Sequence, residues 1–304
     1  MTKLQFHDPQ FQGYLGLQRL AKKQWGQDHQ KIDFYTIIWT EAATITLKFD
    51  GIPMVLPAYS MAFLSPGQVV SLEAQEPEQV WLLEFNKMFY CMELHDKEVS
   101  CNGLLFSGVL ESPFISLDEQ EQHTFMLLRQ VMLEEFANAD NVQAEMLQLL
   151  LKRFIIKSAR LARVQLSDRT KLNNNDIESV RQYSALIEKH FRTAHQVSAY
   201  ADLMNKSPKT LSNLFKKLGG DSPQEILHRR LTLEAKRLFR FTDKSAKEIG
   251  FELGFEDPAH FSRFFKKRTG CSPSDYKISL ETSVYGKIVK SAGISVILCP
   301  LWSR

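Results

Sequence analysis

Short runs of alternating apolar and polar residues in the first 115 positions predict β-strands. Residues 44–49 alternate strictly, and the pair Asp50-Gly51 that follows them is typical of a two-residue hairpin turn. Further runs rich in β-branched and aromatic residues lie at 32–40, 60–64 and 80–85. Short strands joined by close turns indicate a small barrel or sandwich.

Residues 116–172 change to the spacing of amphipathic helices. The sequence Ser116-Leu-Asp-Glu119 predicts a capping box, with a helix running from there to Phe136. A second helix is predicted over residues 142–165, with an apolar stripe made of Leu147, Leu150, Leu151, Phe154, Ile155, Leu161 and Val164. This stripe fits packing on the strands of the same chain and equally fits a contact between subunits, and the two are compatible. The polar, aperiodic residues 167–176 are interpreted as a linker between domains.

The last third of the chain contains an internal duplication. Residues 207–220 and 257–270 match at an offset of 50, in the pairs Pro208/Pro258, Ser212/Ser262, Phe215/Phe265, Lys216/Lys266, Lys217/Lys267 and Gly220/Gly270. Upstream, Ala201 aligns with Gly250 and Met204 with Leu253 at an offset of 49. The second copy therefore has one extra residue in its turn.

Each copy predicts two short helices joined by a tight turn. Ser207 and Asp257 suit the N-cap of the second helix, and each is followed by a proline, which favours the first helical position. The helices that follow are expected to bury Leu211, Leu214, Phe215 and Leu218 in the first copy and Phe261, Phe264 and Phe265 in the second.

The first helix of each pair is predicted at residues 198–205 and 245–254. The second of these opens with the capping box Ser245-x-x-Glu248. Gly254 is expected to take a positive φ in the turn, and Asn205 the same in the first copy. This arrangement is a helix-turn-helix, whose second helix enters the major groove of DNA.

The distribution of charge supports a nucleic-acid partner. Residues 1–175 carry 16 basic and 21 acidic side chains, whereas residues 176–280 carry 19 basic and 13 acidic ones. The second helix of each copy is basic and free of acids, with four basic residues between Lys206 and Leu218 and four between His260 and Arg268. Two such helices favour DNA binding over a merely solvated surface.

A helix over residues 223–241, capped by Ser222 with Glu225 at its third position, joins the two copies. At ~1.5 Å per residue it spans about 28 Å. That length is near one turn of the duplex, about 34 Å, so one subunit is expected to read a bipartite site of about two turns.

These residues resemble the AraC/XylS family of bacterial transcription regulators. The closest likeness lies in residues 245–276, which include Gly-Phe-Glu-Leu-Gly-Phe-Glu-Asp-Pro-Ala-His-Phe-Ser-Arg-Phe-Phe-Lys-Lys-Arg-Thr-Gly. The resemblance implies an α+β multidomain fold: a cupin-like β-barrel that binds an effector at 1–115, a helical dimerisation segment at 116–172 and an all-α DNA-binding domain at 173–280. That last domain would hold helix-turn-helix motifs at 198–218 and 245–268. Residues 281–304 form a tail with an apolar stretch that departs from the family's pattern.

The same resemblance assigns roles on the two second helices. Base reading falls on Lys209, Thr210 and Asn213 in the first copy and on Ala259, His260 and Arg263 in the second. Arg263 suits a bidentate contact to guanine and Asn213 a contact to adenine; a phosphate contact or surface ion pair is the alternative for Arg263, and a solvated position for Thr210. Phosphate contacts, which position without specifying a sequence, are expected from Lys206, Lys216, Lys217, Ser262, Lys266, Lys267 and Arg268.

The expected partners are double-stranded DNA, RNA polymerase, a second copy of the chain and a small-molecule effector. Phe34, Trp39, Phe63 and Trp81 fit an effector pocket in the first domain and equally fit a plain barrel core. The alternatives are a cupin-type enzyme or a protein-interaction module joined to the DNA-binding domain. No cofactor and no metal are expected, because His7, His29, His95 and His123 stand singly rather than in the H-x-H motif of metal-binding cupins.

The composition favours a cytoplasmic protein rather than a secreted one, and the family resemblance tilts towards an activator. The N-terminus has no apolar run, so no signal peptide is expected, and no stretch reaches the roughly 18 apolar residues of a membrane span. The cysteines, Cys91, Cys101, Cys271 and Cys299, are scattered and contain no C-x-x-C pair, which fits reduced thiols.

Overall fold

The computed structural model describes residues 4–8, 12–20, 30–49, 52–90, 104–106, 114–170, 172–219 and 221–280. The expectations for the Asp50-Gly51 turn, for Gly220, for Cys91, Cys101 and Cys299, for His29 and His95, and for the tail at 281–304 fall outside these residues. The chain divides into two compact units, residues 1–188 with 213–220, and residues 189–212 with 221–304. No helix among the described residues is long and apolar enough to span a bilayer.

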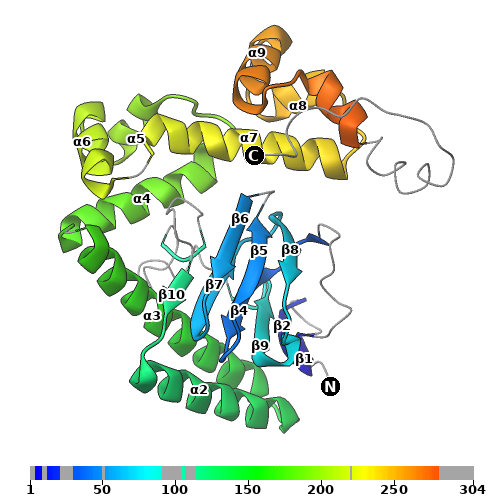
Figure 1. Cartoon of the computed structure of the whole chain (residues 1–304), viewed down its shortest axis with the longest axis vertical. Coiled ribbons are helices and arrows are strands. Elements are labelled where there is room, and N and C mark those ends of the chain that lie inside the picture. The colour runs from blue at the N-terminus through cyan, green and yellow to red at the C-terminus, as the bar shows by residue number, and fades with distance from the viewer. Residues whose placement is uncertain are drawn as a thin grey trace, which may run out of the picture. The chain divides into compact units, whose positions relative to one another are not determined.

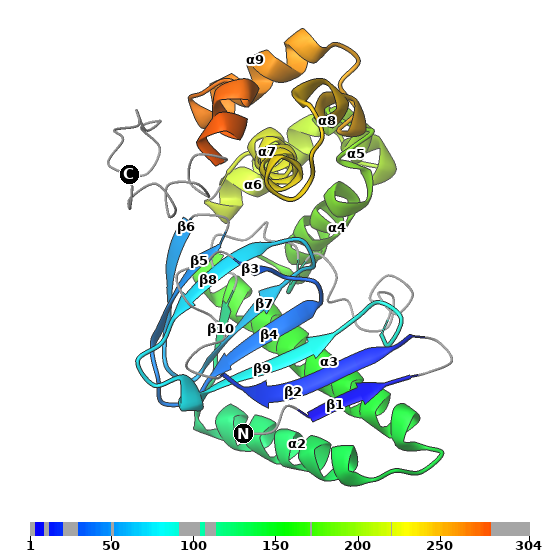
Figure 2. The same cartoon turned by 90° about the vertical axis from the view of Figure 1, so that its right-hand side faces the viewer.

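The described residues of the first unit form ten short strands, which confirms a β-rich N-terminal region. They are β1 (Leu4–His7), β2 (Tyr14–Arg19), β3 (Gln30–Lys31), β4 (Tyr35–Thr40), β5 (Ile45–Phe49), β6 (Ile52–Leu56), β7 (Ser60–Leu64), β8 (Val69–Glu73), β9 (Val80–Phe85) and β10 (Phe114–Ser116). They pair antiparallel in two sheets, of order β1-β2-β9-β4-β7-β10 and β3-β8-β5-β6 (Figure 2). These strands therefore form a two-sheet arrangement rather than one closed barrel.

The alternation of side chains in the larger sheet defines two separate apolar layers. Ile38 pairs with Leu82 and with Ala62, and all three belong to one cluster with Leu47 and Leu72 of the smaller sheet. This inner layer lies between the sheets. Because successive residues of a strand point to opposite faces, the neighbours of these residues lie on the outer face.

Two helices, α2 (Glu119–Ala137) and α3 (Gln143–Thr170), cover that outer face (Figure 1). The ring of Trp39 lies 6.3 Å from that of Phe125 in α2 and 6.1 Å from that of Phe154 in α3. The two phenylalanine rings lie 4.8 Å apart, edge to face. Aromatic packing of this geometry fixes both helices to the sheet.

The start of α2 differs from the sequence prediction. The N-cap is Asp118, which forms a capping box with Glu121, so the box predicted at Ser116 and Glu119 was wrong by two residues. Ser116 instead ends strand β10, and its backbone N–H donates to the side chain of Gln165. A residue held in a strand pairing cannot also supply the cap.

Helix α3 is longer than predicted, and the linker prediction for residues 167–176 was wrong over most of its length. The helix continues to Thr170, and α4 (Asn174–His190) begins four residues later, with the Asn173 side chain accepting from the N–H of Asp176. The asparagines that suggested a loop include a helix cap. At the end of α3 the buried residues are Ala162 and Leu166, whereas Val164 is 57% exposed.

The remaining helices follow the predicted order. They are α5 (Val197–Leu203), α6 (Pro208–Leu218), α7 (Pro223–Phe241), α8 (Ala246–Glu252) and α9 (Pro258–Thr269), and residues 273–280 are also helical. The bounds of α7 are those predicted, and Ser222 caps it as expected by accepting from the N–H of Glu225. A helical C-terminal region is thus confirmed.

Replacing Gly254 with alanine should destabilise the second unit more than replacing Gly270. Both glycines have φ 80°, a conformation that costs other residues about 1–2 kcal/mol. At Gly254 a Cβ would also lie 1.8 Å from the carbonyl oxygen of Arg192, whereas at Gly270 nothing lies within 4 Å. Urea unfolding of the full chain measures the free energy of unfolding for both variants. Equal losses would contradict the close approach at Gly254.

Candidate nucleic-acid interface

Both copies of the duplication close their turn with the same backbone hydrogen bond. The N–H of Lys206 donates to the carbonyl of Ala201 at 2.9 Å, and the N–H of Phe255 donates to the carbonyl of Gly250 at 2.9 Å. The residue before each donor is left-handed, with φ 51° at Asn205 and φ 80° at Gly254. The repeat read from the sequence is therefore a repeat of backbone geometry, and both predicted positive-φ positions are confirmed.

Each second helix begins at the predicted cap. Ser207 Oγ accepts from the N–H of Thr210 at 3.0 Å. The carboxylate of Asp257 accepts from two amides, those of Ala259 at 2.9 Å and His260 at 3.1 Å. The capping box of Ser245 and Glu248 at the start of α8 is also present. These caps satisfy backbone groups that would otherwise lack a partner at the helix ends.

Helix α6 separates an apolar face from a polar one. Leu211, Leu214 and Phe215 are buried, and the Phe215 ring lies 5.1 Å from that of Tyr183 in α4. The side chains expected to meet DNA are exposed, namely Lys209, Thr210, Asn213, Lys216 and Lys217, while Lys206 is half-buried. Lys217 lies 3.6 Å from Asp176, a weak surface pair that leaves the ammonium accessible.

Helix α9 repeats this separation. Phe261 and Phe265 are buried, and Phe264 is half-buried. The exposed side chains among those expected to meet DNA are Ala259, His260, Arg263, Lys266 and Lys267. Ser262 is half-buried, and its hydroxyl donates to the carbonyl of Pro258 within the same helix. Arg268 is half-buried as well, so Ser262 and Arg268 are the two predicted contact residues of α9 that are not exposed.

Arg268 differs from the other basic residues of α9, because its guanidinium is held by Glu225 of α7. Its Nη1 donates to Oε2 at 2.9 Å, and its Nη2 donates to Oε1 of the same carboxylate. These hydrogen bonds, with the arginine's charge, lower the pKa of Glu225 below its usual value, although partial burial opposes this. The pair joins α9 to the first turn of α7, so the expected phosphate contact of Arg268 would compete with a structural role.

A second contact between α7 and the rest of the unit fixes the protonation of His228. The side-chain amide of Gln224 lies 3.2 Å from the carbonyl oxygen of His195 and 2.7 Å from Nε2 of His228. Since a carbonyl only accepts, the NH₂ group of Gln224 must face it, and the same group then donates to Nε2 of His228. This arrangement requires a neutral His228. Its ring packs edge to face on Phe264 of α9, at 5.3 Å.

Burial lowers the pKa of His228, and the nearby cations Arg268 and Lys267 lower it further, while Glu225 opposes them. Burial likewise lowers the pKa of His195, whose Nε2–H donates to the carbonyl of Leu253 at 2.8 Å. Both imidazoles therefore resist a positive charge in the folded unit.

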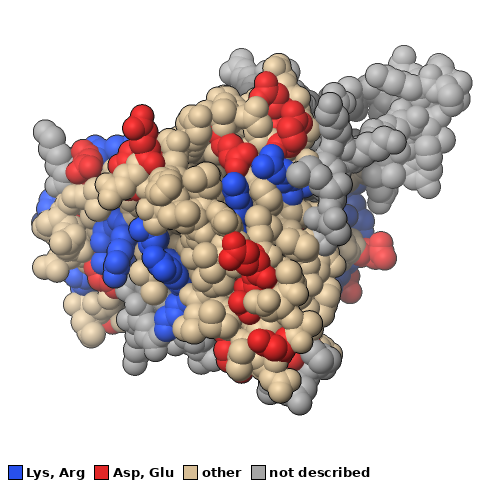
Figure 3. Space-filling model, turned by 90° about the horizontal axis from the view of Figure 1, so that it is seen from below, with Lys and Arg blue, Asp and Glu red and all other residues tan. Residues whose placement is uncertain are grey.

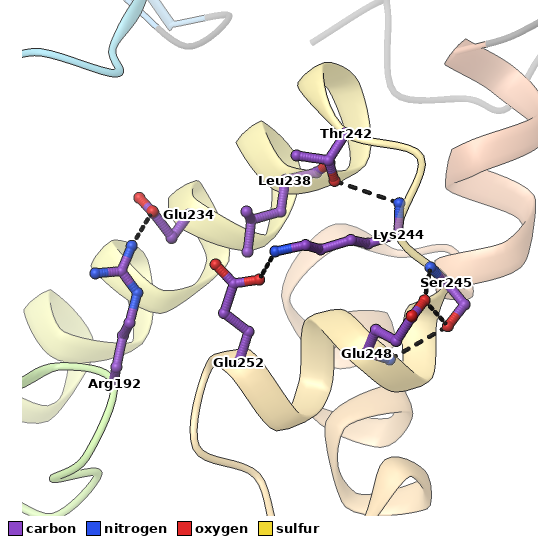
Figure 4. A network of polar contacts seen from close by, with 8 residues as sticks. All are labelled: Arg192, Glu234, Leu238, Thr242, Lys244, Ser245, Glu248 and Glu252. Carbon is purple, nitrogen blue, oxygen red and sulfur yellow. Dashed lines mark hydrogen bonds and ion pairs between the residues drawn. The ribbon is translucent and has the colours of Figure 1, made fainter.

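Acidic residues fasten the junction of α7 and α8 (Figure 4). Lys244 pairs with Glu252, and Ser245 and Glu248 form the capping box beside it. Glu234 pairs with Arg192 and, at 2.8 Å, with Arg230. Burial alone would raise the pKa of Glu234, but the charges of its arginine partners hold it below the usual value. The pair of Lys244 with Glu252 and the capping box position α8, whereas Glu234 joins α7 to the residues that follow α4.

The four residues expected at an effector pocket lie in two different places. Trp39, Phe63 and Trp81 are buried on the outer face of the larger sheet, where Trp39 contacts α2 and α3. Phe34 stacks on Tyr14 at 4.3 Å, and Tyr14 lies on the same face of β2 as Gln18, which pairs with Leu82 of the inner cluster. Of the four, Phe34 therefore lies nearest the space between the sheets.

Sequence reasoning missed several residues that shape the interface. The pairing of Arg268 with Glu225 joins residues 43 positions apart, and the Gln224 contact joins α7 to residue 195. Neither leaves a local signal. Helix α4 did leave one, because its buried residues Ile177, Val180 and Ile187 recur at helical spacing. Among the described residues, no three His, Cys, Asp or Glu side chains come together as metal ligands would.

Comparisons with known proteins find similarity mainly in the helix-turn-helix region. Residues 200–278 match the family model described as "Helix-turn-helix domain". A transcriptional activator called RhaS from Enterobacter sp. (strain 638) is 33% identical over 113 residues, which cover 37% of this chain and 40% of the relative. RhaS from Escherichia fergusonii is 28% identical over 166 residues, covering 54% and 58% of the two chains. The matches thus span less than two thirds of these relatives.

Solved structures give a similar result. The C-terminal domain of the response regulator yesN from Fusobacterium nucleatum is 30% identical, covers 31% of this chain and 93% of its own, and has a TM-score of 0.30. ToxT from Vibrio cholerae, in a structure with bound unsaturated fatty acid, is 15% identical, covers 88% of this chain and 95% of its own, and has a TM-score of 0.39.

Two capped helix pairs with matching turns define this region as a double helix-turn-helix domain. In this region the chain is similar to the RhaS transcriptional activators, in keeping with the resemblance to the AraC/XylS family seen in its sequence.

The stability of the second unit should fall as the pH drops from 7 to 5. The unfolded chain takes up protons on His228 and His195 near pH 6.5, whereas the folded unit resists them, so the unfolded state binds more protons in this window. Above pH 6.5 the stability is fully present. The variant His228→Gln, which can still accept from Gln224, should show a shallower dependence of the free energy of unfolding on pH. An unchanged slope would show that His228 does not contribute.

Proposed function

We propose that this chain is a sequence-specific DNA-binding transcription regulator, and an activator, that reads a bipartite site with two helix-turn-helix motifs per subunit. The observation that carries the proposal is the pair of capped second helices, each of which buries its apolar side and exposes cations on the other. The relatives from Enterobacter and Escherichia fergusonii are named transcriptional activators, which supports the same role. A regulator is proposed rather than an enzyme on these grounds.

The exposed faces suggest how the two kinds of DNA contact are divided. Side chains in the first turns of a helix that enters the major groove can reach base edges, which suits Lys209, Thr210 and Asn213 in α6 and Ala259, His260 and Arg263 in α9. Lysines in the last turns of each helix suit the phosphates, namely Lys216, Lys217, Lys266 and Lys267. Lys206 and Ser262 are proposed to assist at phosphates from half-buried positions.

The first unit is proposed to receive a small-molecule effector. The inner face of the larger sheet offers polar groups near Phe34, where the Tyr14 hydroxyl lies 3.4 Å and the Gln18 amide 3.3 Å from Oε2 of Glu84. Polar groups of this kind orient a ligand when it lies among apolar side chains. The proposed organisation is an effector-binding domain at 1–115, a dimerisation segment at 116–172 and a DNA-binding domain at 173–280.

A homodimer is proposed through α2 and α3. These helices expose several large apolar side chains away from the sheet, namely Met126, Leu127, Val131, Met146 and Leu149. Seen from the side on which α2 lies in Figure 1, areas of uncharged surface lie between the clusters of charged side chains (Figure 3). The dimer is proposed to act beside RNA polymerase in the bacterial cytoplasm, where its DNA lies.

Two alanine variants distinguish base reading from phosphate contact. Arg263→Ala should cost about 1–3 kcal/mol on the specific duplex and relax its preference at one position. Lys216→Ala should weaken binding to every duplex alike and reduce the slope of log affinity against log salt by about one unit. Fluorescence anisotropy over a series of salt concentrations measures both. Equal losses of Arg263→Ala on specific and random DNA would contradict base reading, and an unchanged salt slope would contradict the phosphate contact.

Leu149→Asp should shift the chain from dimer to monomer, because a carboxylate at a buried subunit contact lacks a partner. Leu149 is 61% exposed in the single chain, so the substitution should leave the fold intact. Val55→Asp, on strand β6 at a 57% exposed site outside α2 and α3, is the matched control. Sedimentation equilibrium measures the mass. A variant at Leu149 that associates like the control would argue against this interface.

A further inference from the structure

The N-cap of α9 contacts a base-reading candidate of the same helix. Besides accepting from the amides of Ala259 and His260, the carboxylate of Asp257 places its Oδ2 3.8 Å from Nη2 of Arg263. Both side chains are exposed, at 57% for Asp257 and 73% for Arg263. The hydrogen bonds from the two amides hold the Asp257 carboxylate in one orientation, in which its Oδ2 faces the guanidinium.

The equivalent positions in the first copy carry no charge. There the cap is Ser207, which accepts from the amide of Thr210 and shares a 2.8 Å hydrogen bond with its hydroxyl. The residue that corresponds to Arg263 is Asn213, at the offset of 50. The acidic cap thus occurs in the copy with the arginine, and the neutral cap in the copy with the amide.

Capping alone does not explain the acid. Serine and aspartate cap helices about equally well, and Ser207 already does so in the first copy. The N-terminus of a helix that enters DNA lies close to phosphates, where a carboxylate is repelled and a neutral cap is not. Asp257 also directly precedes a helix that has no acid of its own. On DNA this charge would therefore weaken affinity for the phosphates, whereas Arg263 of the same helix offers it an opposite charge.

We propose that Asp257 is a specificity-determining positioning residue, which holds the guanidinium of Arg263 toward paired acceptors on the edge of a guanine and away from the phosphates. A flexible arginine can satisfy its charge on any phosphate, and such a contact carries no sequence information. With one edge of the guanidinium directed at Asp257, the remaining donors keep the fork that matches O6 and N7 of guanine. Asp257 thereby lowers the affinity for DNA of any sequence and raises the preference for guanine at one position. This inference rests on the proposed function, since it needs Arg263 to read a base.

Asp257→Asn tests the charge while it keeps the cap, because asparagine caps as well as aspartate but forms no ion pair. Glu256→Gln is the matched control, since it removes the same charge from the neighbouring exposed residue, which caps nothing. The probes are the duplex recovered by selection from random DNA with the wild-type chain, its three single-base variants at the position where Arg263→Ala loses preference, and a random duplex. Anisotropy titrations give the affinity ratio, and thermal unfolding reports the fold.

Both charge-neutralising variants should bind the random duplex more tightly than the wild type, because each removes a repulsion from the phosphates. Asp257→Asn alone should lower the preference for guanine, by about threefold for a surface pair of this kind. Its midpoint of unfolding should match that of the wild type. Asp257→Ser, which copies the cap of the first copy, should behave like Asp257→Asn.

Different results distinguish a failure of this inference about Asp257 from a failure of the proposed function. If the wild-type chain shows no preference among duplexes, the proposed function fails and the inference fails with it. If Arg263→Ala loses its preference but Asp257→Asn and Glu256→Gln keep the wild-type ratio, Arg263 reads its base without Asp257, and only the inference is overturned. A loss of preference that appears equally in Glu256→Gln would also overturn it, because the effect would then be one of general charge.

Discussion

The left-handed turn between the two helices of each copy is the constraint on which the interface depends. The backbone must reverse within a few residues for the amide of Lys206 to reach Ala201 and the amide of Phe255 to reach Gly250. A positive φ at Asn205 or Gly254 permits this. The direction of the turn sets the angle at which the second helix leaves, and hence which of its faces is buried. The exposed row of cations on α6 and α9 follows from that angle.

Local rules predicted the helix-turn-helix region well because its signals are short in sequence. Caps at Ser207, Asp257, Ser222 and Ser245, the left-handed Asn205 and Gly254, and the apolar spacing of Phe261 and Phe265 each involve residues within one or two helical turns. The same rules were wrong at Ser116, because a strand pairing that involves β7 had already taken up its backbone. They were also wrong at the supposed linker, where Asn173 serves as a cap rather than a loop residue.

The contacts that fix α7 to α9 could not have been predicted from spacing. Glu225 at the third position of a helix ordinarily suggests a capping box, yet its carboxylate lies on Arg268. His228 has no sequence signal of its own, and its neutral state follows from its burial and from the carbonyl of His195 that orients Gln224. In the first unit, the alternation of strands indicated two faces but not which of them the helices cover. For that reason Trp39, Phe63 and Trp81 fitted a pocket in the sequence, although they are packed beneath helices or buried on the outer face.

The proposed function requires two copies of one capped helix pair to lie in the major groove of one duplex and read it. Selection of bound sequences from random duplex DNA by the purified full chain, at moderate salt, tests this most directly. We expect enrichment of a site with two conserved blocks, with centres about 10 base pairs apart, within the footprint of one subunit. Recovered sequences as diverse as the starting pool, at salt concentrations where the chain still binds DNA, would contradict it.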